Sequence, residues 1–278
     1  MAVLSWLMNR GVLLYLALAS IAFAVFYVGN LVYDISLRDA QYFNGWILVA
    51  GISVLMFLTF RKKVVILPFG QVRKWLKLHY YLGFVTVGVF VVHTNYQIPD
   101  SPLEWLLWCL FVLIAVSGII GGVISKVIPP RLEARGESIL FERIATYRVQ
   151  LAAQAEELVR QSIKHGNTLS ISNLYNDMLA EYFAGHRNII AHLRASTRPL
   201  AGMLGALDAI ERYLDKDGKG DLEQMRALVE AKNNLDFRYA NGALMKLWLF
   251  FHIPATYAMM VAIIVHIIIS YAFSTGIA

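Results

Sequence analysis

The fold is decided by an apolar stretch with a histidine at each end, His79-Tyr-Tyr-Leu-Gly-Phe-Val-Thr-Val-Gly-Val-Phe-Val-Val-His93. Near the C-terminus a second apolar stretch, from His252 to His266, repeats the spacing of fourteen residues. At about 1.5 Å of rise and about 100° of rotation per residue, such side chains share nearly one face of a helix, roughly 21 Å apart along its axis. The two stretches therefore predict two layers of histidine within one membrane.

If the two helices face each other, each layer holds two opposed imidazoles, which is the protein ligand set of a six-coordinate haem iron. A single histidine in an apolar helix is more often a packed polar residue than a ligand. Ionisable residues at membrane depth are rare, however, and four of the seven histidines form two pairs of identical spacing. We therefore predict two b-type haems, with His79 and His252 as the metal ligands of one and His93 and His266 as those of the other.

The composition predicts an integral membrane protein, because 58% of the 278 residues are hydrophobic and many of them lie in long uninterrupted runs. Cys109 is the only cysteine, which excludes intrachain disulfides, covalent Cys-x-x-Cys-His haem attachment and iron–sulfur clusters held by this chain alone. The net charge of +6 is not clustered on a soluble domain, so no nucleic-acid partner is expected.

Five apolar runs predict an all-α integral membrane fold with five transmembrane helices around two b-type haems. The expected spans are 11–33, 45–60, 75–96, 103–128 and 245–273. Pro129-Pro130 is expected to end the fourth span. We divide the chain into residues 1–130, which hold the first four spans, residues 131–243, and residues 244–278, which hold the fifth span and a short outer tail.

Residues 131–243 differ in character, because they carry fifteen basic and fifteen acidic residues with helical periodicity. They predict a helical domain inserted between the fourth and fifth spans. Its expected helices are 137–164, 171–183, 186–195 and 199–214, followed by one that opens at a capping box of Asp221 and Gln224 and runs towards the fifth span.

Charge predicts the orientation. Outside residues 131–243, nine of ten basic residues fall on one side of the five-span arrangement, and all four acidic residues fall on the other. The positive-inside rule then puts the N-terminus and the helical domain in the cytoplasm and the C-terminus outside, in what we expect to be a bacterial inner membrane. The two histidine helices run parallel, which pairs His79 with His252 near the cytoplasmic face and His93 with His266 near the outer face.

Further residues could support the cofactors. Gly83 and Gly88 are small enough to leave room for a haem edge, although close helix packing explains them equally well. Arg73 and Lys77 are candidates for the propionates of the inner haem, although they could equally be topological anchors. A quinone site could be lined on the outer side by Asp34, Asp39, Gln41, Tyr42 and Tyr96, or on the inner side by Trp75 and Tyr80.

Two other patterns do not predict a site. The stretch from Asp215 to Asp221 resembles a calcium loop but has Arg226 where the bidentate glutamate belongs, so we expect a turn. His186 and His192 are six residues apart and share no helical face, so a metal site there is not expected.

The two spans with paired histidines resemble the dihaem membrane domain of ferric reductases and NADPH oxidases. More loosely, the five spans resemble the quinol-oxidising dihaem subunits of respiratory complexes, such as the nitrate reductase gamma subunit. Both resemblances imply b-type haem and electron flow across the membrane, with His79, His93, His252 and His266 as axial ligands. No region predicts a flavin or nicotinamide domain.

Three functions are open at this point. The favoured one is a dihaem cytochrome b subunit that carries electrons between membrane quinone and partner redox proteins, such as a c-type cytochrome or an iron–sulfur protein, in a larger complex. The second is the membrane component of a ferric or oxygen reductase fed by a separate flavoprotein. The third is a membrane scaffold or transporter without redox chemistry, in which the histidines are polar contacts between helices or line a path for protons or metal ions.

Overall fold

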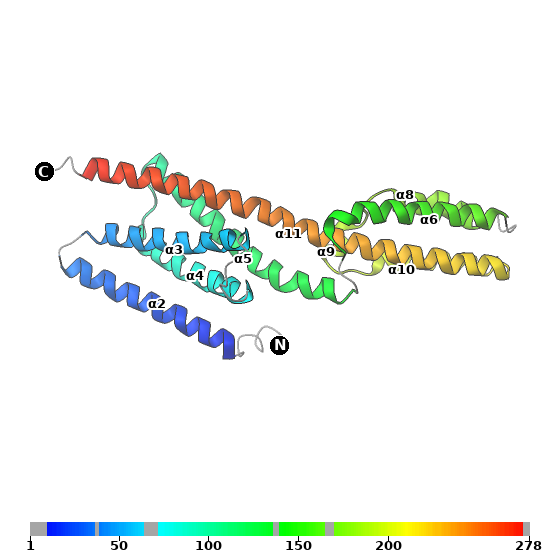
Figure 1. Cartoon of the computed structure of the whole chain (residues 1–278), viewed down its shortest axis with the longest axis horizontal. Coiled ribbons are helices and arrows are strands. Elements are labelled where there is room, and N and C mark those ends of the chain that lie inside the picture. Colours follow the sequence, from blue (N-terminus) through cyan, green and yellow to red (C-terminus); the bar gives the residue numbers. More distant parts are fainter. Residues whose placement is uncertain (1–9, 37–38, 64–71, 136–138, 165–169, 275–278) are drawn as a thin grey trace. The chain divides into compact units, whose positions relative to one another are not determined.

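The structure is a computed structural model that describes residues 10–36, 39–63, 72–135, 139–164 and 170–274. These residues form helices and turns and contain no strand, which confirms the all-α prediction (Figure 1). The longer helices are α2 (Arg10–Ile35), α3 (Ala40–Lys63), α4 (Val72–His93), α5 (Pro102–Glu133), α6 (Ile144–Lys164), α10 (Arg198–Glu211) and α11 (Lys216–Ser274). The shorter ones are η1 (Phe141–Arg143), α7 (Ser170–Leu174), η2 (Tyr175–Leu179), α8 (Ala180–Ala184) and α9 (Ile189–Leu193).

Five of the described helices, α2 to α5 and α11, are long and apolar enough to cross a membrane. Their apolar segments correspond to the five predicted spans. Hydrophobic side chains cover much of their outer surface, including Val25 and Val261 at 68% and 63% exposure. Such exposure is typical of helices that face lipid, where the apolar surface does not have to be buried against protein.

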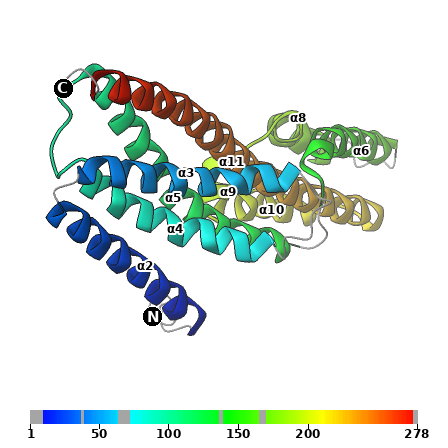
Figure 2. The same ribbon diagram turned by 60° about the vertical axis from the view of Figure 1, so that its left-hand side comes forward.

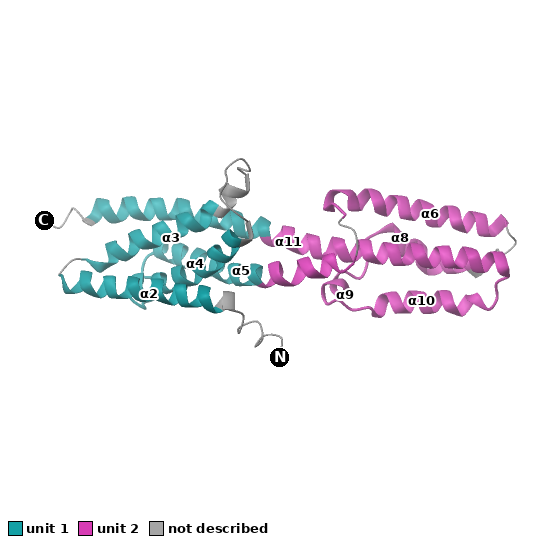
Figure 3. Cartoon of the chain, turned by 60° about the horizontal axis from the view of Figure 1, so that its bottom comes forward, with its two compact units in different colours: residues 1–122, 249–278 teal, residues 123–248 magenta. Residues whose placement is uncertain are grey.

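The chain divides into two compact units, drawn in different colours in Figure 3. The first combines Met1–Gly122 with Leu249–Ala278, and the second is Val123–Trp248. Within the first unit α4 packs against both α2 and α3 (Figures 1 and 2). All five apolar helices contribute to its core, which consists of Phe26, Leu48, Ile52, Val89, Val92, Phe111, Met259 and Ile263.

The start of α5 follows from its sequence. Ser101 and Glu104 form a capping box, in which the Glu104 amide donates to the Ser101 hydroxyl over 3.3 Å and the Ser101 amide donates to the Glu104 carboxylate over 3.4 Å. Pro102 then occupies the first helical position, where its missing amide hydrogen costs nothing.

The predicted end of α5 is wrong, because the helix continues through Pro129 and Pro130 to Glu133. The fixed φ of proline is compatible with a helix. Because the two prolines are adjacent, the helical hydrogen bonds that their missing amide hydrogens remove are confined to one turn. Backbone bonding resumes directly afterwards, where the Ala134 amide donates to the Pro130 carbonyl over 3.0 Å. Two prolines near the end of a helix therefore did not stop it.

The prediction for the start of α11 is also wrong. The helix begins at Lys216, and Asp215 rather than Asp221 is its cap, accepting a 2.8 Å hydrogen bond from the Gly218 amide. The supposed turn from Asp215 to Asp221 is therefore the first part of a helix. From there α11 runs for 59 residues, through Pro254, to Ser274.

The second unit contains a core of its own. The predicted helix 171–183 corresponds to α7, η2 and α8 in direct succession, and α10 lies close to its predicted position. The start predicted for the helix 137–164 is wrong, because α6 begins at Ile144, directly after η1. The fully buried side chains at its centre come from α6, α7, η2, α8, α10 and α11, and they include Ala155, Ile171, Leu179, Phe183, Leu207, Met225 and Val229. The second unit is therefore a helical domain with a hydrophobic centre, as the periodicity of residues 131–243 predicts.

Candidate functional site

Two of the four predicted ligands lie next to each other in the first unit. His79 on α4 and His252 on α11 have ring centroids 6.5 Å apart, with the ring planes at 68°. A first-row metal lies about 2.0–2.1 Å from an imidazole nitrogen, so two imidazoles on opposite sides of one metal have ring centres about 6.3 Å apart. The spacing of this inner pair therefore fits a shared metal centre.

Each ring of the inner pair is held at Nδ1. His79 Nδ1 lies 3.1 Å from the carbonyl oxygen of Leu55 on α3, and His252 Nδ1 lies 2.6 Å from Oγ of Ser117 on α5. A metal-binding histidine commonly uses one ring nitrogen for such a hydrogen bond and the other for the metal. The Gly118 backbone beside Ser117 also lies close to this ring, because a Cβ there would be 3.9 Å from His252 Cε1.

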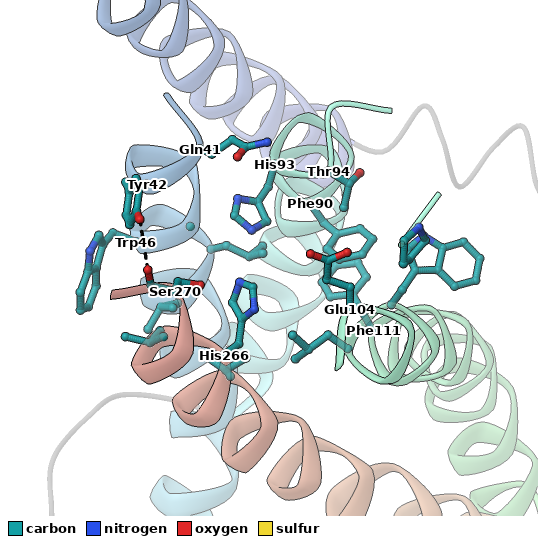
Figure 4. A pocket seen from close by; sticks show the side chains of 18 of the residues that line it. Gln41, Tyr42, Trp46, Phe90, His93, Thr94, Glu104, Phe111, His266 and Ser270 are labelled. Carbon is teal, nitrogen blue, oxygen red and sulfur yellow. Dashed lines mark hydrogen bonds between the residues drawn. The ribbon is translucent and has the colours of Figure 1, made fainter. Parts of the chain in front are cut away.

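The other two predicted ligands line a cavity of about 570 Å³. Figure 4 shows the rings of His93 and His266 pointing into it, towards one another, from α4 and α11. Phe90 and Phe111 form one wall, stacked with ring centroids 3.8 Å apart. The volume lies within the range of about 300–1,000 Å³ that is typical of ligand and cofactor sites.

His93 has an unusual environment in this cavity. Its Nδ1 is buried and makes no hydrogen bond of good geometry with the described residues, although the Gln41 backbone lies near the ring. Its ring is placed by packing, since a Cβ at Gly45 would come within 3.2 Å of His93 Cε1. A buried polar atom without a partner costs free energy, and a bound group in the cavity could supply the missing interaction.

The remaining predicted cofactor residues lie in different surroundings. A Cβ at Gly83 would contact nothing within 4 Å, whereas one at Gly88 would lie 2.5 Å from the Phe23 ring on α2. The ammonium group of Lys77 lies 5.6 Å from the centre of the Tyr15 ring. Arg73 belongs to the first turn of α4, but its side chain lies outside the described residues.

Three of the predicted outer quinone residues, Asp39, Gln41 and Tyr42, line the cavity, and the Tyr42 hydroxyl donates to the Ser270 carbonyl over 3.4 Å. Tyr96 is 74% exposed, and Asp34 is also exposed. Trp75 and Tyr80, the residues predicted for an inner quinone site, both contact aromatic rings. The ring centroids of Trp75 and Phe57 are 5.8 Å apart, and those of Tyr80 and Phe84 are 4.9 Å apart.

Sequence reasoning missed Ser117, Gly45 and Asn44. Ser117 is buried among apolar residues of α5, and a polar residue in the middle of such a span is the signal that could have found it. Asn44 precedes Gly45 on α3 and is 2% exposed, with an Oδ1 that has no partner among the described residues. Gly45 is recognised only by its distance from His93, which no sequence pattern indicates.

The second unit contains a different cluster of titratable groups. Lys232 and Asp236, both on α11, form a buried pair with 2.5 Å between Nζ and Oδ2. Asp236 also accepts from His186 Nδ1 over 3.1 Å, and Lys232 donates to the Gly185 carbonyl over 2.8 Å. Burial lowers the pKa of His186, against the opposing effect of Asp236, and burial also lowers the pKa of His192.

Within the described ranges, no group of three or more His, Cys, Asp or Glu side chains converges as a metal site. The histidine pairs of the first unit each offer two ligands, which is the protein ligand set of an iron whose other ligands come from a porphyrin. No protein-family model, curated protein or solved structure matches the chain.

Proposed function

We propose that the chain is a dihaem cytochrome b subunit that carries electrons across a membrane. The observation that carries the proposal is the pairing of four histidines from two apolar helices. His79 and His252 have ring centroids 6.5 Å apart, and His93 and His266 line one cavity. Haem b held between two imidazoles supplies one-electron oxidation and reduction and leaves iron no open position for another ligand.

The residues of the chain have distinct tasks in this proposal. His79 and His252 would hold the inner haem. The Nδ1 atom of His79 is hydrogen-bonded to the Leu55 carbonyl, and that of His252 to the Ser117 hydroxyl. His93 and His266 hold the outer haem in a cavity walled by aromatic rings. Neutral imidazole is the form of histidine that binds iron.

Membrane quinone is the proposed small-molecule partner. The cavity around His93 combines polar side chains, including Gln41 and Tyr42, with the aromatic ring of Trp46. Trp46 is 52% exposed, and its indole nitrogen donates to the Tyr271 hydroxyl over 3.0 Å. Such an amphipathic rim suits a ligand with a polar head and an apolar tail. The proposed protein partners are other subunits of a redox complex. We place this complex in a bacterial inner membrane, with the second unit of the chain in the cytoplasm.

The proposal is tested by a reduced-minus-oxidised visible spectrum of the purified chain with a pyridine haemochrome count. Two b haems per chain are expected, and His93→Ala should lose one haem and keep the other. A colourless protein would overturn the proposal and favour a membrane scaffold or transporter.

Electron exchange is tested on the same preparation. Reduction of the oxidised protein by added quinol is expected. Reoxidation of the reduced protein by a ferric chelate but not by quinone would contradict the quinone partner and support the reductase alternative.

A further inference from the structure

Ser117 on α5 lies beside the inner histidine pair, in contact with His252. It is 7% exposed, and its hydroxyl donates to the Ile114 carbonyl of its own helix over 2.9 Å. His252 Nδ1 lies 2.6 Å from the same oxygen. We assign the single hydroxyl hydrogen to the Ile114 carbonyl, which can only accept, so the oxygen accepts from His252 Nδ1. With this assignment His252 carries its proton on Nδ1 and the lone pair on Nε2.

The same logic applies to His79. The Leu55 carbonyl oxygen can only accept, so His79 Nδ1 is also the protonated nitrogen. Both rings of the inner pair are thus in the tautomer that presents Nε2 to a metal. His93 of the outer cavity differs, because its Nδ1 makes no hydrogen bond of good geometry with the described residues.

We propose that Ser117 is a positioning residue that sets the tautomer and rotation of His252 and lowers the reduction potential of the inner haem. The inference rests on the proposed function. An acceptor on Nδ1–H raises the basicity of the opposite nitrogen, and a more basic ligand stabilises oxidised iron more than reduced iron. The shortness of the contact makes this effect larger for His252 than for His79, whose hydrogen bond is 3.1 Å long.

The test is a redox titration of the purified chain in which each haem is followed by its own absorption band. Ser117→Ala should make one haem easier to reduce by about tenfold in its reduction equilibrium constant, or about 59 mV for one electron, and leave the other unchanged. Ser117→Thr keeps the hydroxyl and should stay at the wild-type potentials.

Ser53→Ala is the matched control. Ser53 also donates its hydroxyl to a backbone carbonyl of its own helix, over 2.8 Å to Val49, but it is exposed. Unchanged potentials are expected in this variant. Should Ser117→Ala lose one haem outright while Ser117→Thr keeps both, the positioning role is supported as well.

A second readout does not depend on bound haem. In the haem-free protein, ¹⁵N resonances of the imidazole of His252 should report protonation at Nδ1, and Ser117→Ala should shift them towards a mixture of tautomers. Two haems in the wild type with unchanged potentials in Ser117→Ala would overturn this inference and leave the proposed function intact. A Ser117→Thr variant that behaves like Ser117→Ala would also overturn it, whereas a wild type without haem would overturn both.

Discussion

Histidines with restricted exposure occur in both compact units, but their partners differ. In the first unit His79 and His252 face each other and bind neutral groups, a backbone carbonyl and a hydroxyl. In the second unit His186 binds the carboxylate of Asp236, stacks on the Tyr239 ring with centroids 3.5 Å apart, and lies in a network with a buried lysine. The difference lies in what each ring faces, because His79 and His252 face a second imidazole whereas His186 faces a carboxylate and a tyrosine ring.

The largest expected effect tests this distinction directly. The double variant His252→Ala and His266→Ala removes one ligand from each pair and should strongly reduce binding of both haems, because each iron loses one of its two protein ligands. The matched double variant His186→Ala and His192→Ala should keep both haems. The measurement is the pyridine haemochrome count per chain, and loss of haem in the second variant alone would reverse the comparison.

The next prediction concerns the charged network of the second unit. Lys232 is fully buried and Asp236 is 1% exposed, so Lys232→Met leaves a buried carboxylate without its ammonium partner. The free energy of unfolding of this unit should fall by about 3–5 kcal/mol. Chemical denaturation of the whole chain in detergent measures the effect. Lys219→Met on the exposed surface of α11 is the control and should change little; equal stability of the two variants would contradict the prediction.

A pH dependence follows from the lowered pKa values of His186 and His192. In the unfolded chain both titrate near 6.5, whereas burial keeps them neutral in the fold, so the unfolded state binds more protons below that pH. The stabilisation is present above 6.5 and is lost as the pH falls through the folded pKa values, with a slope of at most about 1.4 kcal/mol per pH unit for each histidine.

Denaturation of the second unit at a series of pH values measures this slope. Replacing both histidines with glutamine should flatten the curve. A stability that rises on acidification between pH 6.5 and 5 would contradict the assigned direction.

The smallest expected effect concerns packing in the outer cavity. Gly45→Ala adds a Cβ at 3.2 Å from His93 Cε1, so the ring must shift by a few tenths of an ångström. We expect a cost of about 1 kcal/mol, which is roughly a fivefold weaker binding of the outer haem. Competition with an apo-globin acceptor measures the release of haem. Gly202→Ala, where a Cβ would contact nothing within 4 Å, is the control.

Much of the first unit could be predicted from the sequence because its signals are local and periodic. Apolar runs give the five helices, and equal spacing of fourteen residues in two parallel helices gives the pairing of His79 with His252 and of His93 with His266. The helical segments of the second unit also follow from periodicity. Whether the pairs bind haem, and the orientation of the chain in the membrane, stay predictions.

What could not be predicted depends on contacts between helices or on competing local signals. The hydrogen bond between Ser117 and His252 and the approach of Gly45 to His93 join residues far apart in the chain. At the start of α11, Asp215 and Asp221 both resemble a cap, and the sequence alone does not decide between them. The pair of Lys232 and Asp236 has the four-residue spacing of a helical ion pair, but its burial follows only from the packing around it.

The equal separation of the histidines on α4 and α11 restricts how the two helices can change during evolution. Insertion of one residue between His252 and His266 would rotate everything beyond it by about 100° and turn the outer imidazole away from His93, while the inner pair stayed in register. A compensating insertion in α4 would be needed to restore the match. Related chains should therefore keep the number of residues between the histidines of these two helices constant, even where loops and the second unit vary in length.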